Sequence, residues 1–226
     1  MKTASKIPAK KILVIDVGGT NLKIHVSGAK EPVKVPSGPA MTAAQMAAAV
    51  NKVSAAWTFE AVSIGFPGPV KNDRPVREPH NLGGGWVKFD FKKAFGKPVK
   101  MINDAAMQAL GSHTGGCTLF LGLGTGLGSA LVIDGGVLPL ELAHLPYHKN
   151  KSFEQYLGNL ALKRLGKKKW RKHVEEVVTM LKNALLADTV VLGGGNARLI
   201  KKFPKGVEAG KNSNAILGGE RLWKNP

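Results

Sequence analysis

Short apolar runs alternate with amphipathic stretches along most of this 226-residue chain. β-Branched runs predict strands over 11–17, 21–27, 32–35, 61–65, 99–102, 118–123, 128–133 and 189–192. Apolar positions at helical spacing predict helices over 104–111, 153–165, 168–187 and 214–223. A further helix is predicted to begin at a Thr42 cap, with Gln45 at the capping-box position, and to end near Trp57. This alternation predicts an α/β architecture in which helices cover sheets.

The two halves of the chain follow the same plan, since each opens with a strand, a glycine-rich turn and a second strand. We predict a small N-terminal lobe over 1–112 and a larger C-terminal lobe over 113–212. The last segment, 213–226, is predicted to form a helix that joins the first lobe. Residues 70–97 carry little periodicity, which indicates a long functional loop.

Three glycine-rich turns follow apolar runs, at 16–20, 122–128 and 193–196. Because glycine has no Cβ, backbone N–H groups there can approach anionic oxygens closely and form concave anion sites. Asp16 lies in the first turn, and a carboxylate beside a polyanion suits a divalent cation between them. The third turn is expected to lead into a helix whose N-terminus faces an anion. Together the turns predict one phosphate-rich ligand held by several loops, with Asp16 binding Mg²⁺ through water.

Each turn also has a simpler interpretation. The turns at 16–20 and 122–128 each join two strands, so either could be only the tight turn of a β-hairpin. No Walker A sequence occurs in the chain, and the glycine spacing of 122–128 does not match the dinucleotide fingerprint. The joint occurrence of three turns favours phosphate binding over hairpins alone.

The composition of the chain restricts the cellular compartment and the classes of partner that we expect. The chain has 33 Lys and Arg against 15 Asp and Glu, a net charge of +18, which attracts polyanions such as nucleic acid, polyphosphate or acidic membranes. The single cysteine, Cys117, excludes a disulfide framework and a cysteine-cluster zinc site. No apolar stretch approaches the length of a membrane span, and the first ten residues lack the apolar segment of a secretory signal. We therefore expect a cytoplasmic protein with no membrane partner.

Five motifs stand in a fixed order along the chain. They are Asp16-Val-Gly-Gly-Thr20, Asn103-Asp104, Gly124-Thr125-Gly126, Glu141-Leu-Ala-His144 and Gly193-Gly-Gly195. In this order they resemble the ROK family of sugar kinases, and the resemblance covers nearly the whole chain after Lys10. The stretch Ser152-Phe-Glu-Gln-Tyr-Leu-Gly158, shortly after the fourth motif, is most similar to the polyphosphate glucokinase branch. The resemblance implies a two-lobed actin-like ATPase (ribonuclease H-like) fold, with duplicated β-sheet lobes and flanking helices.

The resemblance also implies an activity, which is transfer of a phosphoryl group to the 6-hydroxyl of glucose, with Mg²⁺ and polyphosphate or ATP as donor. Asp104 is expected to accept or orient the proton of the attacking hydroxyl, although it could instead be only the N-cap of the next helix. The residues expected to bind sugar are Asn81, Asn103, Asp104, Glu141, His144 and Glu154. The residues expected to bind phosphate are Asp16, Gly18, Gly19, Thr20, Asn21, Lys23, Gly124, Thr125, Gly126, Gly194 and Gly195.

The resemblance leaves open whether the phosphoryl donor is polyphosphate or ATP. In related nucleotide-using kinases the loop that corresponds to 193–196 lies beside the adenosine. Here its flanks are short and rich in lysine, and they predict little apolar surface for a base. We therefore expect inorganic polyphosphate to be the preferred donor, with an ATP-dependent glucokinase or other hexose kinase as the alternative.

The sequence departs from the family pattern after Glu141. Many members carry a cysteine-rich zinc loop there, whereas this chain has His148-Lys-Asn-Lys151, so we predict no zinc site. Ala143 replaces the usual glycine, and His144 could contact sugar or only orient its neighbours. Glu154 could be an ordinary acid at a helix start. The resemblance also implies a homodimer.

The same residues are compatible with other function classes to different degrees. Family members that are repressors carry an additional helix-turn-helix module, for which the ten residues before the first strand leave no room, so no specific nucleic-acid partner is expected. Glu141 and Glu154 could flank a glycosidic bond, but a glycosidase leaves the three glycine turns unexplained. A noncatalytic sensor of sugar or polyphosphate remains the second alternative to a kinase.

Overall fold

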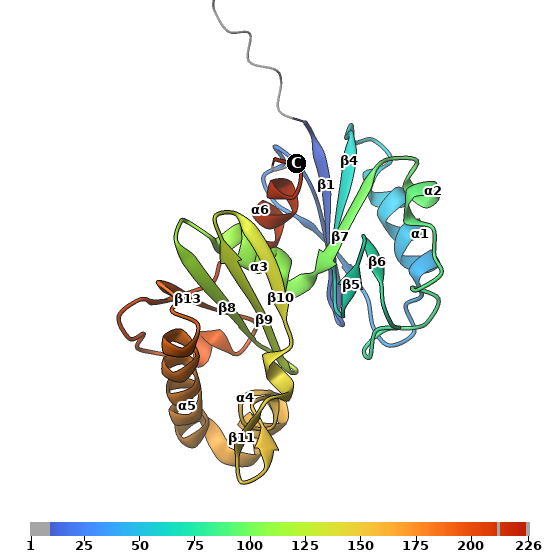
Figure 1. Cartoon of the computed structure of the whole chain (residues 1–226). Coiled ribbons are helices and arrows are strands. Elements are labelled where there is room, and N and C mark those ends of the chain that lie inside the picture. The colour runs from blue at the N-terminus through green and yellow to red at the C-terminus, as the bar shows by residue number, and fades with distance from the viewer. Residues whose placement is uncertain (1–9, 212, 225–226) are drawn as a thin grey trace, which may run out of the picture. The chain divides into compact units, whose positions relative to one another are not determined.

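The computed structural model of the chain describes residues 10–211 and 213–224. The chain divides between Ile102 and Asn103 into two compact units, each built on a five-stranded sheet (Figure 1). The first sheet has the order β3 (Val33–Pro36), β2 (Asn21–Val26), β1 (Ile12–Val17), β4 (Ala61–Phe66) and β7 (Val99–Asn103). The second has the order β10 (Gly136–Leu140), β9 (Leu127–Ile133), β8 (Cys117–Leu123), β13 (Thr189–Gly193) and β14 (Val207–Ala209).

The two sheets repeat one topology. In each, the first three strands in sequence form an antiparallel meander, and the next strand pairs in parallel with the first strand of that meander. The turns at 16–20 and 122–128 are therefore hairpin turns between β1 and β2 and between β8 and β9. The repeat predicted from the sequence is confirmed at the level of strand order.

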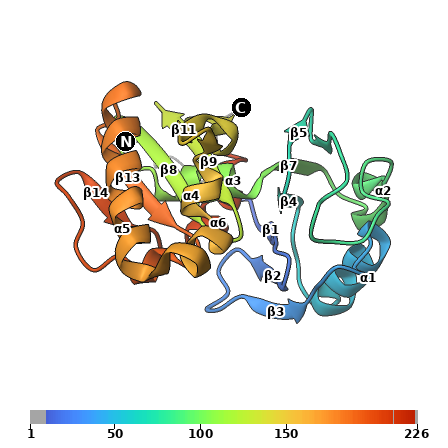
Figure 2. The same ribbon diagram turned by 90° about the horizontal axis from the view of Figure 1, so that it is seen from below.

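Helices α1 (Ala43–Ser54) and α2 (Phe91–Phe95) cover one face of the first sheet (Figure 2). The predicted capping box is confirmed, because Thr42 Oγ1 accepts from the Gln45 N–H and Gln45 Oε1 accepts from the Thr42 N–H. The core beneath these helices holds Trp86, which is fully buried and packs against Phe66 and Phe91. Large aromatic rings of this kind contribute much of the apolar area that stabilises a small unit.

The loop that contains Trp86 is fixed to this unit by a short network. Glu78 accepts hydrogen bonds from the Trp86 and Val87 N–H groups, and the Trp86 indole donates to the Gly83 carbonyl at 2.7 Å. The region predicted as one long loop, 70–97, also contains a small hairpin of β5 (Val70–Lys71) and β6 (Arg74–Pro75), besides α2. It is thus an ordered segment with little regular structure.

The second sheet is covered on both faces. The long helix α5 (Asn159–Ala184) packs on Leu119, Leu121 and Leu123 of β8 in one apolar core. Because alternate side chains of a strand point to opposite faces, Phe120 faces the other side, where α3 (Asp104–Ser112) packs on the sheet. α5 is interrupted at Gly166, whose φ of 71° separates two helical segments. The sequence predicted this interruption as a gap between two helices.

Helix α6 (Asn214–Arg221) packs on α3 at backbone contact. A Cβ at Gly111 would overlap with the Asn214 carbonyl, and a Cβ at Gly218 would overlap with the Met107 carbonyl. The Arg221 guanidinium donates to the Leu110 and His113 carbonyls at 2.6 and 2.7 Å, which supplies positive charge at the C-terminus of α3. The C-terminal helix therefore fixes α3 in position.

The structure differs from the sequence predictions at several points. The unit boundary lies after Ile102 and not after residue 112, because α3 packs on the second sheet and on α6. For the same reason the C-terminal helix belongs with the second unit and not with the first lobe. The helix predicted after the third glycine turn is wrong, since only the single 3₁₀ turn η2 (Ala197–Leu199) follows it. Strands β10 and β14 were not predicted. No helix among the described residues has the length and apolar character that crossing a bilayer requires.

We expect Gly218→Ala to destabilise the protein by about 1–3 kcal/mol, because the added methyl group must push α6 away from α3. This cost exceeds the roughly 1 kcal/mol of helix propensity that alanine gains over glycine. Urea unfolding measures the change. Gly84→Ala is the matched control, since its Cβ would enter open space and its effect should stay within about 0.5 kcal/mol. Equal stability of the two variants would contradict the close helix contact.

Candidate functional site

In the first unit, Asp16 and Lys23 form a partly buried ion pair at the first glycine turn. They are cross-strand neighbours on β1 and β2, and Lys23 Nζ lies 2.8 Å from Asp16 Oδ2. Asp16 is only 6% exposed. The turn closes through a hydrogen bond from the Gly18 N–H to the Asn21 carbonyl. The sequence placed both charged residues in the phosphate-binding set, and the structure brings them into contact.

Asn81 reaches the same turn from the loop that Trp86 anchors. A Cβ built on Gly19 would lie 3.2 Å from the Asn81 Cβ, so the asparagine packs directly on this glycine. On the other side, the Ser37 hydroxyl donates to the Gly18 carbonyl at 2.6 Å and the Ser37 N–H donates to the Thr20 carbonyl. Ser37 was missed by the sequence reasoning, because a serine after an edge strand carries no distinguishing signal.

The chemistry of the first turn suits a magnesium ion. Mg²⁺ prefers oxygen ligands and is usually held by one or two carboxylates together with substrate phosphates and water. Lys23 bonds to Asp16 Oδ2, and no residue in the described part of the chain hydrogen bonds to the other oxygen, Oδ1. Thr20 adds a hydroxyl in the same turn. Asp16 could therefore offer Oδ1 to a hydrated ion while Lys23 holds the carboxylate in place.

In the second unit, the second and third glycine turns are joined by Asn196. Its N–H donates to the Leu123 carbonyl at 2.9 Å, and its side-chain amide donates to Asn159 Oδ1 at 2.7 Å and to the Gly124 carbonyl at 3.4 Å. Gly194 has a φ of 79° and leaves no space for a Cβ against the Leu123 backbone, so only glycine suits this position. Gly124, Thr125, Gly194 and Gly195, predicted as separate phosphate contacts, thus belong to one assembly.

Glu154 lies against the second turn. It is the first residue of α4 (Glu154–Leu157), and its Oε2 accepts from the Leu127 N–H at 3.3 Å beside Gly126. The Asn159 N–H donates to the carbonyls of Gly124 and Thr125 from the start of α5. The structure therefore places Glu154, predicted to bind sugar, among the residues that shape the second glycine turn.

Asp104 stands at the start of α3. The structure contradicts the alternative that Asp104 is only the N-cap of this helix. The cap is Asn103, whose Oδ1 accepts from the Ala105 and Ala106 N–H groups at 3.0 and 3.1 Å. A Cβ built on Gly128 would lie 2.9 Å from the Ala105 Cβ, so the first turn of α3 packs on the strand that leaves the second glycine turn. The helix start that carries Asp104 is therefore held against this strand, and Asp104 Oδ1 itself accepts from the Ala105 N–H at 2.8 Å.

Glu141 and His144 lie together on the surface of the second unit. They flank the 3₁₀ turn η1 (Leu142–His144), with His144 Nε2 3.6 Å from Glu141 Oε2 and both side chains more than 60% exposed. Ala143, between them, is buried in the core of this unit and has a negative φ. The alanine in the family's glycine position is thus accommodated without backbone strain.

The segment that could have held a zinc loop is a tight hairpin of β11 (Pro146–His148) and β12 (Lys151–Ser152). Lys149 and Asn150 form its turn with φ values of 50° and 58°, as in a type I′ turn. Within residues 10–211 and 213–224, no group of three or more His, Cys, Asp or Glu side chains is arranged to hold a metal ion.

An aromatic cluster attaches this hairpin to α5. The Tyr147 hydroxyl lies 3.0 Å from His173 Nδ1, and both rings pack edge-on or tilted against Tyr156. Burial raises the pKa of Tyr147, and the neighbouring Glu176 raises it further. Burial lowers the pKa of His173, with His148 and Arg164 acting in the same direction and Glu176 against it. At neutral pH the protonated tyrosine can therefore donate to a neutral imidazole.

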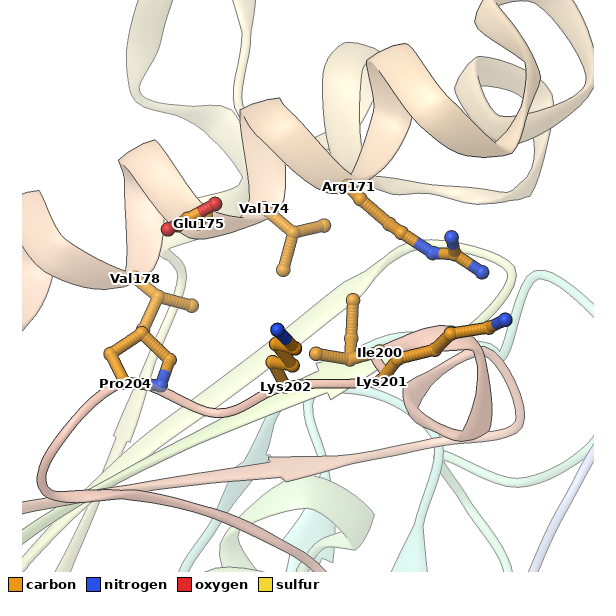
Figure 3. A pocket seen from close by; sticks show the side chains of 8 residues that line it. All are labelled: Arg171, Val174, Glu175, Val178, Ile200, Lys201, Lys202 and Pro204. Atoms are coloured by element: carbon orange, nitrogen blue, oxygen red, sulfur yellow. The ribbon is translucent and has the colours of Figure 1, made fainter.

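A cavity of about 320 Å³ lies between α5 and the segment after η2 (Figure 3). Val174 and Val178 of α5 face Ile200 and Pro204 across it, and Arg171, Lys201 and Lys202 bring cationic groups to its rim. Arg171 Nε donates to the Leu199 carbonyl at 2.7 Å and so joins the helix to this segment. The sequence predicted little apolar surface in the segments that flank the third glycine turn. The structure shows apolar side chains on the segment that follows this turn, and half of the apolar lining of the cavity comes from α5.

Comparison with known proteins shows which family this chain belongs to. A model described as the ROK family matches residues 12–139. The polyphosphate glucokinase of Mycobacterium tuberculosis (strain CDC 1551 / Oshkosh) is 26% identical over 213 residues, which cover 84% of this chain and 79% of that protein. The similarity therefore extends over most of both chains.

Solved structures agree on the fold. The inorganic polyphosphate/ATP-glucomannokinase of Arthrobacter sp. strain KM superposes with a TM-score of 0.78 at 23% identity, over 93% of this chain and 97% of that one. A ROK family glucokinase from Streptomyces griseus, solved with glucose and AMPPNP, gives a TM-score of 0.72 at 18% identity, over 96% and 100% of the two chains. The predicted actin-like α/β fold with two sheet lobes is confirmed.

His173 gives the protein a pH-dependent stability. Its folded-state pKa lies below its ordinary value near 6.5, so between the two values the unfolded chain binds more protons and stability rises with pH. We expect the thermal midpoint to fall between pH 7 and pH 5, and His173→Gln to reduce this fall. His113→Gln provides a comparison, because burial and Arg221 also lower the pKa of His113. An unchanged pH slope in His173→Gln would contradict the assignment.

Proposed function

Because the chain belongs to the ROK family, we propose that it transfers the terminal phosphoryl group of inorganic polyphosphate to the 6-hydroxyl of glucose, which gives glucose 6-phosphate. The similarity to a polyphosphate glucokinase over 84% of this chain supports the substrates. The observation that carries the proposal is the packing of Ala105 on Gly128, which holds Asp104 beside the second glycine turn. An acid next to a phosphate-binding turn is the arrangement that phosphoryl transfer to a hydroxyl needs.

In this mechanism Asp104 accepts the proton of the sugar hydroxyl as its oxygen attacks the terminal phosphorus. The new O–P bond forms while the bond to the rest of the polyphosphate chain breaks. Backbone N–H groups of the glycine turns donate to the phosphate oxygens. Mg²⁺, when bound at Asp16, would neutralise charge on those oxygens. Asn81, Asn103, Glu141 and His144 are proposed to hydrogen bond the sugar hydroxyls.

The assignment of Asn103 fits its observed bonds. Its Oδ1 accepts hydrogen bonds from two backbone N–H groups of α3. These two bonds fix the orientation of the side-chain amide and therefore the direction of its Nδ2 group. Glu154 has a different role in the proposal. By holding the Leu127 N–H it shapes the second turn, and it acts on the donor and not on the sugar.

A second candidate is an ATP-dependent kinase of the same family, and the cavity beside η2 favours it. Its apolar walls of Val174, Val178 and Ile200 could receive a purine base, while Arg171 and Lys201 at the rim suit an anion. Glu175 also lines the cavity and could accept a hydrogen bond from an exocyclic amino group. The surface charge supports polyphosphate, whereas this cavity supports a nucleotide.

The first test compares glucose 6-phosphate formation with long-chain polyphosphate and with ATP as the sole donor, in the presence of Mg²⁺. We expect polyphosphate to give the higher kcat/KM. Ile200→Trp, which would fill the cavity, should then leave polyphosphate turnover unchanged. If ATP is the better donor and Ile200→Trp abolishes its use, the second candidate replaces the first.

Asp104→Asn separates an enzyme from a noncatalytic sensor. We expect kcat to fall by about 10²–10⁴-fold, because the amide cannot accept the proton, while glucose binding measured by calorimetry is retained. The isosteric change keeps the cap and the start of α3 intact. Asp134→Asn, which makes the same change at an exposed residue of the turn between β9 and β10, should leave kcat unaltered. Full turnover by Asp104→Asn would contradict the role of Asp104 as the base.

A further inference from the structure

The second unit carries a row of unpaired cations that the reaction itself does not use. On α5, Lys168 and Lys172 are exposed and stand one helical turn apart, with Arg171 beside them. Lys201, Lys202 and Lys205 are exposed on the segment after η2. We call these six residues the basic strip. Within the described part of the chain, none of the six has an ion-pair partner.

The two halves of the basic strip lie side by side. Arg171 and the pair Lys201 and Lys202 line the same cavity, with the Arg171 and Lys201 side chains at the same end of it (Figure 3). Further along α5, a Cβ built on Gly206 would lie 2.9 Å from Lys182 Cε, so the segment follows the helix from Arg171 to Lys182. This distance is about 16 Å along the helix axis. The cations of the segment, Lys201, Lys202 and Lys205, therefore run beside this part of α5, while the α5 cations of the basic strip lie at its start.

The aromatic and acidic residues near the basic strip indicate which kind of polyanion suits it. Single-stranded nucleic acids are bound by cations together with exposed aromatic rings on which bases stack. Trp170, next to Arg171, is fully buried, Phe203 packs against the core, and His173 packs against Tyr147 and Tyr156. Among the described residues that line the cavity, Glu175 is the one acid. The strip thus offers charge without stacking surfaces, which suits a chain of phosphates that carries no bases.

We propose that the basic strip binds the part of a long polyphosphate chain that extends beyond the reacting end, and so makes donor affinity depend on chain length. The inference rests on the proposed function for the identity of the ligand. Long chains gain additional contacts with the strip, whereas a donor of three phosphates does not reach it. The strip retains the chain electrostatically, and none of its residues takes part in phosphoryl transfer.

The test uses the triple variant Lys168→Gln, Lys172→Gln and Lys205→Gln, which avoids the residues that line the cavity. Equilibrium binding of long-chain polyphosphate and of tripolyphosphate is measured over a range of salt concentrations. The matched control is Lys30→Gln, Lys52→Gln and Lys97→Gln, which removes three exposed charges from the first unit. Thermal unfolding checks that both triple variants are folded.

We expect the strip variant to bind long-chain polyphosphate at least about tenfold more weakly, with the slope of log K against log salt reduced by about 2. Tripolyphosphate binding and the control variant should stay close to the unmodified protein. Three results would overturn the proposal. These are an equal loss in the control, an equal loss for tripolyphosphate, and competition by single-stranded RNA as effective as that by long-chain polyphosphate.

Turnover measured in parallel reports on the proposed function separately, because binding to the strip requires no reaction. A protein that makes glucose 6-phosphate only from ATP, but whose strip binds long polyphosphate as described, contradicts the proposed donor and leaves the strip supported. A protein that uses polyphosphate of every length equally well, before and after the triple substitution, supports the proposed function and overturns the strip.

Discussion

Contact between the backbones of α3 and α6 is the constraint on which the candidate site depends. Gly111 and Gly218 allow the helices to approach until no Cβ fits between them, and Arg221 ties the C-terminus of α3 to α6 through two carbonyls. At the other end of the same helix, Asn103 caps the first turn and Ala105 packs on Gly128. A helix held at both ends keeps Asp104 at a fixed place beside the second glycine turn.

The glycine turns show that a hairpin and an anion site are compatible interpretations of one sequence. The turns at 16–20 and 122–128 are true hairpin turns, as the simpler interpretation predicted. Side chains from elsewhere in the chain then fix each of them in one conformation: Asn81 and Ser37 in the first unit, and Glu154 and Asn196 in the second. An isolated hairpin turn does not need such fixation, whereas a preorganised set of N–H donors does.

Local patterns predicted most of the elements, and long-range packing accounts for what they missed. Thr42 and Gln45 identified the start of α1, and the β-branched runs identified all three strands of the first meander and the strands β8 and β9 of the second. The unit boundary, the place of α6 and the contact of Glu154 with the second turn depend on residues far apart in sequence, which periodicity does not report. The apolar wall of the cavity was missed for the same reason, since Val174 and Val178 come from α5 and not from the segment next to the third turn.

In the second unit, most of the residues that carry positive charge are different from the residues that shape the glycine turns. The residues that shape the glycine turns of this unit are amides or acids that bond to backbone groups, such as Asn159, Asn196 and Glu154. Most of the exposed lysines of the described second unit lie instead on α5 and on the segment after η2. Long-range attraction is therefore supplied by residues that can vary in number without disturbing the turns, while the geometry of the turns depends on short hydrogen bonds that salt does not screen. In the proposed function, this separation would let surface lysines attract a highly charged ligand while backbone N–H groups, held by Asn196 and Glu154, position it.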